Sequence, residues 1–308
     1  MGSLNGKRVI VLGAGTMGAS IALVFARGGA DVWITARSQQ SLERCRGQIQ
    51  TAARELDESS NLESLMNHIT LVTDARQFLE AADLVVETIR EDLGDKQQIL
   101  REVNDAAPRS ALVVSNTSSL NLDEVFFRVN APERTAGLHW FNPAHLIPLV
   151  EVVRTSHTSD ETVQTLTAWM NELGKVGVVV EHAVQGFIAN RLQYALLREA
   201  YALVQAGVCS ADDIDRAVTS SIGARWAAIG PFASMDLAGL DVHLAVATTL
   251  FPTLATDQSA PTTLVDLVEA GSLGCKSGDG LLGRYPSDRQ DELRKRLVRS
   301  LKAAADST

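Results

Sequence analysis

The run Lys7-Arg8-Val9-Ile10-Val11-Leu12-Gly13-Ala14-Gly15-Thr16-Met17-Gly18 places a Gly-x-Gly-x-x-Gly motif between an apolar strand and an apolar-periodic helix. In this context the first glycine permits a tight turn, the second lets the backbone approach a pyrophosphate, and the third lets the helix pack on the strand. The helix N-terminus supplies N–H donors and a positive dipole to the phosphates. We therefore expect five residues to bind a dinucleotide: Gly13, Gly15, Thr16, Met17 and Gly18.

Strands and helices alternate after this motif. Apolar runs predict strands at 7–12, 31–36, 69–73, 83–87 and 112–115, and helical periodicity predicts helices at 16–28, 38–55, 75–80, 94–106 and 121–127. Further strands are expected at 134–140, 147–153 and 176–181, with a helix at 159–173. Such alternation is typical of a parallel sheet with both faces covered. The predicted fold class is α/β, with an N-terminal Rossmann-type doubly wound sheet.

The pattern changes after Gly186. Apolar residues then recur at helical spacing in a long segment without a breaker: Phe187, Ile188, Leu192, Leu196 and Leu203. Ser210 followed by Asp213 resembles a capping box for the next helix, and no alternating strand follows. The chain is expected to divide into a cofactor domain, residues 1–184, and an all-α C-terminal domain, residues 185–308.

The composition excludes several classes of partner. A formal charge of −9 over 308 residues argues against nucleic acid, because that binding draws mainly on Lys and Arg. No apolar run reaches the roughly 18 residues that a membrane span needs, and no secretory signal is visible, so we expect a cytoplasmic protein away from the membrane. Cys45, Cys209 and Cys275 lack metal-ligand spacing, so we expect reduced thiols and no metal.

A histidine and a carboxylate lie on two successive predicted strands. In the run Gly137-Leu138-His139-Trp140-Phe141-Asn142-Pro143-Ala144-His145-Leu146-Ile147-Pro148-Leu149-Val150-Glu151, a turn at Asn142-Pro143 can bring His139 and Glu151 together. A base oriented by a carboxylate suits an alcohol that loses its proton as its carbon loses hydride. For His139 taken alone, a core histidine bonded to a backbone carbonyl is the favoured alternative.

Two further polar groups are candidates for the same site. The segment Ser115-Asn116-Thr117-Ser118-Ser119-Leu120 follows a strand at its carboxyl end, where open α/β sheets bind ligands. The start of a capped helix explains this cluster equally well. Asn190 opens the long helix after the boundary, either as a surface amide or facing the interdomain cleft.

Together these segments resemble the 3-hydroxyacyl-CoA dehydrogenase family over nearly the whole chain. The resemblance is carried by Gly13 to Gly18, Val86-Glu87 through Lys96, Ser115 to Leu120, Gly137 to Glu151, Gly186 to Arg191, Gly230-Pro231-Phe232 and Lys276-Ser277-Gly278-Asp279-Gly280. It implies that His139 is the catalytic base and Glu151 its orienting partner. It also implies that Ser118 and Asn190 bind the substrate oxygen.

The same resemblance implies further sites. Glu87 and Lys96 would lie beside the nicotinamide ribose, and Asn116 would also contact the cofactor. The helical C-terminal domain would build a homodimer. One departure lies near the C-terminus, where Leu281-Leu282 replaces an aromatic pair of the family.

The end of the second predicted strand departs from the family in a way that bears on the cofactor. NAD-binding members of this fold carry an Asp or Glu there, whereas this chain has Ala36 followed by Arg37 and Ser38. The nearest acid, Asp31, begins the strand. Without the carboxylate nothing repels a 2′-phosphate, which Arg37 and Ser38 could hold. We expect NADP in preference to NAD, and the alternative is NAD binding beside a solvated arginine.

A second departure bears on the substrate. In members that use coenzyme A, lysines mark the extended helix after the second strand, whereas residues 51–65 contain one basic residue and four acids. The segment Gly223-Ala224-Arg225-Trp226 resembles relatives acting on free hydroxy acids such as L-gulonate and L-carnitine. Arg225, beside Trp226, could bind a carboxylate through two parallel hydrogen bonds, or pair with Asp236 or Asp241 instead.

The sequence therefore favours an NAD(P)-dependent dehydrogenase of a small 3-hydroxy carboxylic acid. The first alternative is a 3-hydroxyacyl-CoA dehydrogenase. The second is a non-catalytic protein on the same scaffold, such as a cofactor sensor or a lens-crystallin relative of this family. Retention of Ser118, His139, Glu151 and Asn190 together argues against a non-catalytic role.

Overall fold

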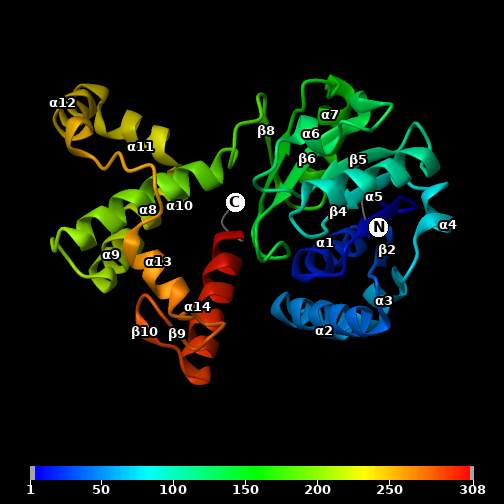
Figure 1. Cartoon of the computed structure of the whole chain (residues 1–308), viewed down its shortest axis with the longest axis horizontal. Coiled ribbons are helices and arrows are strands. Elements are labelled where there is room, and N and C mark those ends of the chain that lie inside the picture. The colour runs from blue at the N-terminus through cyan, green and yellow to red at the C-terminus, as the bar shows by residue number, and fades with distance from the viewer. Residues whose placement is uncertain (1–3, 306–308) are drawn as a thin grey trace. The chain divides into compact units, whose positions relative to one another are not determined.

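The computed structural model describes residues 4–305, which form two compact units that divide between Ala189 and Asn190 (Figure 1). The sequence places the boundary a few residues earlier, between positions 184 and 185. We refer to the two parts as unit 1 and unit 2.

Unit 1 contains an eight-stranded sheet in the order β3-β2-β1-β4-β5-β6-β7-β8. All neighbouring strands pair in parallel except β6 and β7, which are antiparallel. The strands are β1 (Arg8–Leu12), β2 (Asp31–Thr35), β3 (Ile69–Val72), β4 (Leu84–Glu87), β5 (Leu112–Ser115), β6 (Thr135–Trp140), β7 (Leu149–Val153) and β8 (Val176–Val180). This architecture confirms the predicted α/β class.

Helices cover both faces of the sheet and bury its apolar strands. Side chains alternate between faces along β1: Val9 and Val11 join one core with α1, α2 and α7, and Ile10 and Leu12 join another with α5 and α6. The helices are α1 (Thr16–Arg27), α2 (Gln39–Glu55), α3 (Leu62–Asn67), α4 (Arg76–Leu79), α5 (Leu93–Ala106), α6 (Leu122–Val125) and α7 (Asp160–Glu172), with 3-10 turns at Ser59–Asn61 and Pro132–Arg134.

The strand order creates a topological switch point between β1 and β4. From β1 the chain proceeds outward to β2 and β3, then returns to β4 on the other side of β1. Ligands of open α/β sheets bind outside the carboxyl ends of strands at such a point. The glycine motif follows β1 and therefore lies at this crevice.

Residues 51–65 do not form one continuous helix. Helix α2 ends at Glu55, and Asp57 has φ of +60°, in the left-handed region that ends helices. The Glu58 N–H donates to the Ala53 carbonyl at 2.9 Å, which closes the C-terminal turn. Helix α3 starts afresh at Leu62, so the acidic residues do not share one helix.

Unit 2 is helical, as expected. Ser210 and Asp213 form the predicted capping box at the start of α9. A hairpin with two residues in each strand interrupts the helices, and no strand alternates with helices in the described part of unit 2, as predicted. The elements are α8 (Ala189–Gln205), α9 (Ala211–Ala217), a π-helical turn (Val218–Ile222), α10 (Gly223–Ile229), α11 (Pro231–Ala238), α12 (Leu240–Leu250), a 3-10 turn (Phe251–Thr253), α13 (Thr262–Glu269), β9 (Asp279–Gly280), β10 (Gly283–Arg284) and α14 (Ser287–Ala305).

Candidate active site

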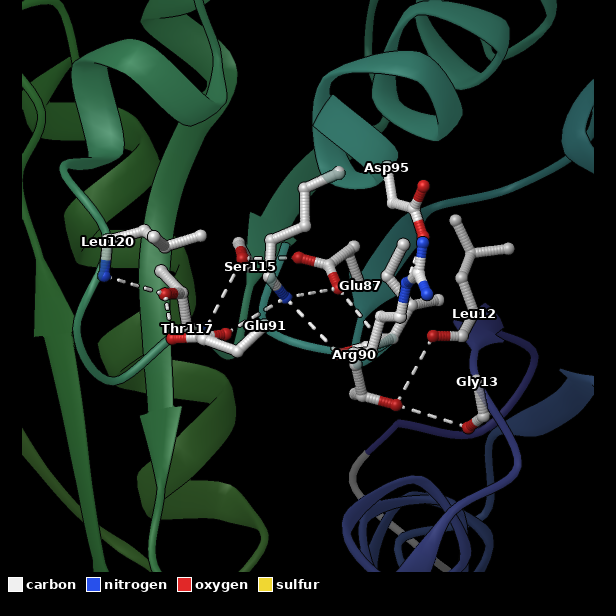
Figure 2. Close-up of polar contacts among 12 residues, drawn as sticks. Leu12, Gly13, Glu87, Arg90, Glu91, Asp95, Ser115, Thr117 and Leu120 are labelled. Carbon is white, nitrogen blue, oxygen red and sulfur yellow. Dashed lines mark hydrogen bonds and ion pairs between the residues drawn. The ribbon is translucent and has the colours of Figure 1, made fainter. Parts of the chain in front are cut away.

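The glycine motif borders a cavity of about 890 Å³ in unit 1. Gly13 has φ of +116°, a conformation that favours glycine, and a Cβ on Gly18 would lie 1.8 Å from the Gly13 carbonyl oxygen. At Gly15 an added Cβ would meet nothing within 4 Å, so the bare backbone faces open space. Thr88 Oγ1 lies 3.2 Å from the Leu12 carbonyl oxygen and 3.1 Å from that of Gly13 (Figure 2). This fixed loop at the start of α1 fits a pyrophosphate.

The structure divides the predicted cofactor residues by position. Five line the cavity: Gly13, Gly15, Thr16, Ala36 and Arg37. Gly18 is buried, and Met17 packs against the core that the sheet forms with α1, α2 and α7. Ser38 caps α2, because its Oγ accepts the Ser41 N–H at 3.2 Å. Sequence reasoning missed further polar residues that line the cavity, among them Ser41, Arg44 and Thr88.

Glu87 and Lys96 form a buried ion pair rather than lining this cavity. Lys96 Nζ lies 2.7 Å from Glu87 Oε1, and the two side chains are only 1% and 0% exposed (Figure 2). Ser115 Oγ donates to the other Glu87 oxygen. The pair therefore joins β4, α5 and β5 beneath the site, and its expected place beside the nicotinamide ribose stays a prediction.

Glu91 is the carboxylate that holds the predicted substrate loop, and sequence reasoning missed it. Its Oε1 accepts the N–H of Ser118 at 3.0 Å and of Ser119 at 3.2 Å. The same oxygen accepts the hydroxyl proton of Thr117 (Figure 2). Burial alone would raise the pKa of Glu91, but the Thr117 hydrogen bond, the Lys96 charge, the Ser118 N–H and the Ser119 hydroxyl lower it. The available signal was its position just after a predicted strand end.

His139 and Glu151 lie directly opposite each other on the antiparallel pair β6 and β7. His139 Nδ1 lies 2.7 Å from Glu151 Oε2, and both residues are buried. Among residues 4–305, no side chain or backbone group forms a hydrogen bond with His139 Nε2. The imidazole is therefore held at one nitrogen and available at the other.

The remaining surroundings fix this pair in place. Glu151 Oε1 accepts the N–H of Ile188 at 3.0 Å and of Ala189 at 2.9 Å. The His139 ring stands edge-on to Phe141 and Phe187, with centroids 4.5 and 5.3 Å away. Both carboxylate oxygens of Glu151 are thus engaged, which orients the histidine.

Asn116 joins the substrate loop to the histidine strand. Its Oδ1 accepts the N–H of Trp140, the residue after His139, at 2.8 Å. Because Ser118 is held by Glu91 and Asn116 is held by β6, the loop after β5 is anchored beside the imidazole strand.

Three predicted substrate residues belong to unit 2. Asn190 lies in the first turn of α8, and Arg225 and Trp226 lie on α10 with exposed side chains. Within the described residues of unit 2, Arg225 forms no ion pair, so pairing with Asp236 or Asp241 is not observed. The roles of these three residues stay predictions.

The described residues contain neither a metal-binding cluster nor a membrane-spanning helix. Within residues 4–305, no cluster of three or more His, Cys, Asp or Glu side chains is arranged to hold a metal ion. No helix in that range is long and apolar enough to cross a membrane.

The chain matches known proteins over both units. Residues 8–183 match the family model described as 3-hydroxyacyl-CoA dehydrogenase, NAD binding domain, and residues 186–283 match its C-terminal domain. A relative from Mesorhizobium japonicum, 5-formyl-3-hydroxy-2-methylpyridine 4-carboxylate 5-dehydrogenase, is 33% identical over 297 residues, which are 95% of this chain and 96% of the relative. The 3-hydroxybutyryl-CoA dehydrogenase of Clostridioides difficile is 30% identical over 279 residues, 89% of this chain and 98% of that enzyme.

A solved structure agrees with the first of these relatives. A 5-formyl-3-hydroxy-2-methylpyridine 4-carboxylic acid 5-dehydrogenase, described as an NAD⁺-dependent dismutase, has a TM-score of 0.88 and 32% identity. The match covers 96% of this chain and 96% of that one.

Proposed function

The chain belongs to the 3-hydroxyacyl-CoA dehydrogenase family, and from that premise we propose that it oxidises a small 3-hydroxy acid with a free carboxylate, or reduces the matching oxo acid. Family members are nicotinamide-dependent oxidoreductases that act on a CH–OH group, and this protein is one of them. The observation that supports the chemistry is the contact of 2.7 Å between His139 Nδ1 and Glu151 Oε2.

The protein's own groups handle the proton. A bound nicotinamide supplies the hydride acceptor. His139 Nε2 accepts the hydroxyl proton, while Glu151 keeps the other ring proton on Nδ1 and stabilises the imidazolium. Ser118, on the loop held by Glu91, and Asn190 bind the substrate oxygen.

The free carboxylate is assigned to Arg225. Its guanidinium is exposed and forms no ion pair within the described residues of unit 2, and the adjacent Trp226 is 45% exposed. A guanidinium binds a carboxylate through two parallel hydrogen bonds, which a thioester cannot match. The relative from Mesorhizobium japonicum is named for a carboxylate substrate.

The acidic residues between positions 51 and 65 give less support for this choice than the sequence suggested. The Arg27 guanidinium lies 3.2 Å from Glu58 and neutralises its charge locally, and Glu55 is hydrogen-bonded to His145 at 2.8 Å. Repulsion of coenzyme A phosphates by this segment is therefore weaker than expected. The choice of a free acid depends mainly on Arg225.

For the cofactor we propose NADP as preferred and NAD as second. Ala36, the first residue after β2, carries no carboxylate, and the adjacent Arg37 lines the cavity. The structurally similar dismutase is described as NAD⁺-dependent, whereas the NADP preference proposed here is supported by the missing carboxylate after β2 and by the positive charge that lines the cavity beside it.

We also propose a cytoplasmic homodimer that assembles through unit 2. Cys45, Cys209 and Cys275 are free thiols, as a reducing compartment requires. Helices α11 and α12 and the 3-10 turn after α12 expose large apolar side chains, including Phe232, Leu244 and Phe251. Large apolar side chains left exposed on neighbouring helices are candidates for an interaction site.

The alternative is a 3-hydroxyacyl-CoA dehydrogenase, favoured by the relative from Clostridioides difficile. The deciding experiment compares kcat/KM for 3-hydroxybutyrate and 3-hydroxybutyryl-CoA, each with NADP⁺ and NAD⁺. We expect the free acid with NADP⁺ to be the best pair. Arg225→Met should reduce the free-acid value roughly 10- to 100-fold, because a hydrogen bond to a charged group is lost.

Arg216→Met is the matched control, since this exposed arginine on α9 is already paired with Asp213 at 2.6 Å. Efficient turnover of the CoA thioester, unaffected by Arg225→Met, would replace the free-acid assignment by the alternative. Absence of turnover with either substrate class would favour a non-catalytic role.

A further inference from the structure

Four arginines line the cofactor cavity, and two of them are neutralised where they stand. Arg76 lies 2.8 Å from Asp74, and Arg90 pairs with Asp95. The other two are Arg37, between β2 and α2, and Arg44, on α2. Neither forms an ion pair within residues 4–305. One part of the cavity rim therefore carries uncompensated positive charge.

Arg44, the second of these arginines, lies close to two hydroxyl groups at the start of α2, those of Ser38 and Ser41. Arg44 Nη2 donates to Ser41 Oγ at 3.0 Å. Ser41 Oγ lies 3.0 Å from Ser38 Oγ, and the Ser41 N–H donates to Ser38 Oγ at 3.2 Å. Arg44 is thus positioned by a neutral hydroxyl, and most of its five N–H donors stay available.

We propose that Arg44, positioned by Ser41, binds the 2′-phosphate of NADP and is the main determinant of cofactor choice in this chain. This inference rests on the nicotinamide-dependent function proposed above. A 2′-phosphate replaces the ribose hydroxyl at the end of β2, next to Ala36, where a carboxylate would repel it. A phosphate monoester carries between one and two negative charges at neutral pH and suits a guanidinium with two parallel N–H donors.

Arg37 is less suited to this role than Arg44. The hydrogen bond from Arg90 lowers the pKa of Asp95, and the charge of Arg37 also contributes to that shift. Arg37 therefore lies within electrostatic reach of the acidic residue on α5. Arg44 forms no ion pair within the described residues, so a phosphate would be its first directly bound anionic partner.

The test is direct binding, without turnover. Titration calorimetry with adenosine 2′,5′-bisphosphate and with 5′-AMP isolates the 2′-phosphate, since both ligands share the adenosine and the 5′-phosphate. We expect the unaltered protein to bind the bisphosphate more tightly. Arg44→Met should weaken bisphosphate binding about 10- to 100-fold and leave 5′-AMP binding unchanged.

Arg46→Met is the matched control, because Arg46 is exposed on the same helix and does not line the cavity. It should leave both affinities unchanged. The preference for the bisphosphate should also fall as salt is raised, as charge pairing requires.

Three results would overturn the inference. An Arg44→Met protein within twofold of normal bisphosphate affinity would move the phosphate to another residue. An equal loss for both ligands would show that Arg44 acts on the fold rather than on the 2′-phosphate. An unaltered protein that prefers 5′-AMP would refute both this inference and the NADP preference, while the hydroxy acid activity is judged separately by turnover.

Discussion

Glu151 accepts three N–H groups, and this arrangement determines how Glu151→Gln affects the tautomer of His139. Oε2 faces His139 Nδ1, and Oε1 faces the N–H groups of Ile188 and Ala189. In Glu151→Gln the amide oxygen keeps the two backbone donors, so the NH₂ group faces Nδ1. Nδ1 must then accept, and the ring proton moves to Nε2, which can no longer take a proton from the substrate.

We therefore expect Glu151→Gln to lower kcat by roughly 10²–10⁴ with cofactor affinity unchanged, the range of a lost general base. Glu161→Gln, an exposed carboxylate at the start of α7, is the control. Steady-state kinetics and cofactor titration measure both quantities. A near-normal kcat in Glu151→Gln would show that the carboxylate does not set the tautomer.

Replacement of the histidine itself should separate binding from chemistry. His139→Asn removes the proton acceptor, so we expect a loss of roughly 10²–10⁴ in rate and little change in cofactor affinity, because the glycine loop is on β1. His157→Asn, at an exposed histidine in the turn after β7, should behave as the unaltered protein. If His139→Asn kept its rate, the base would be another residue.

At the scale of elements, the sequence predicted what repeats along the chain. Apolar periodicity located the strands, and the turn at Asn142-Pro143 brought His139 opposite Glu151, because an antiparallel turn sets the register. The sequence could not show that Glu87 is buried against Lys96, or that Glu91 accepts the N–H groups of the loop after β5. Those outcomes depend on which side chains turn inward after folding.

Lys175, the residue before β8, is a buried cation that sequence reasoning did not single out, and it binds the connection between β6 and β7. Lys175 Nζ donates to the carbonyl oxygens of Ala144 at 2.7 Å and Ile147 at 2.9 Å. Burial, assisted by the charge of Arg27, lowers the pKa of Lys175 to about 8. The charge on Lys175, which binds the loop between β6 and β7, therefore changes with pH.

The sign of this linkage follows from the lowered pKa. Between about pH 8 and 10.5 the unfolded chain keeps the proton on Lys175 and the folded chain loses it, so stability from this group rises with pH. Urea unfolding of the unaltered protein and Lys175→Met should differ by a free energy that changes by about 3 kcal/mol over that window. Lys7→Met, at a more exposed lysine paired with Asp83, should show no such trend. Parallel stability curves for the unaltered protein and Lys175→Met would contradict the assignment.

At the scale of the whole molecule, the two units differ in how they bury apolar side chains. Unit 1 has two closed cores on the faces of its sheet. Unit 2 leaves Phe232 81% exposed on α11 and Leu244 70% exposed on α12. A folded helical unit with such surface is expected to cover it with another protein surface, and a second copy of the chain is the partner proposed here.

We therefore expect sedimentation velocity to give twice the chain mass of 33.1 kDa. Leu244→Glu places a charge in the proposed interface, so it should yield monomers at concentrations where the unaltered protein is dimeric, because an unpaired charge is costly to bury. Phe127→Glu is the matched control, since Phe127 is 77% exposed in unit 1 and outside the proposed interface. Circular dichroism should show that both variants keep their helical content. A monomeric unaltered protein, or equal dissociation in both variants, would remove unit 2 as the dimer interface.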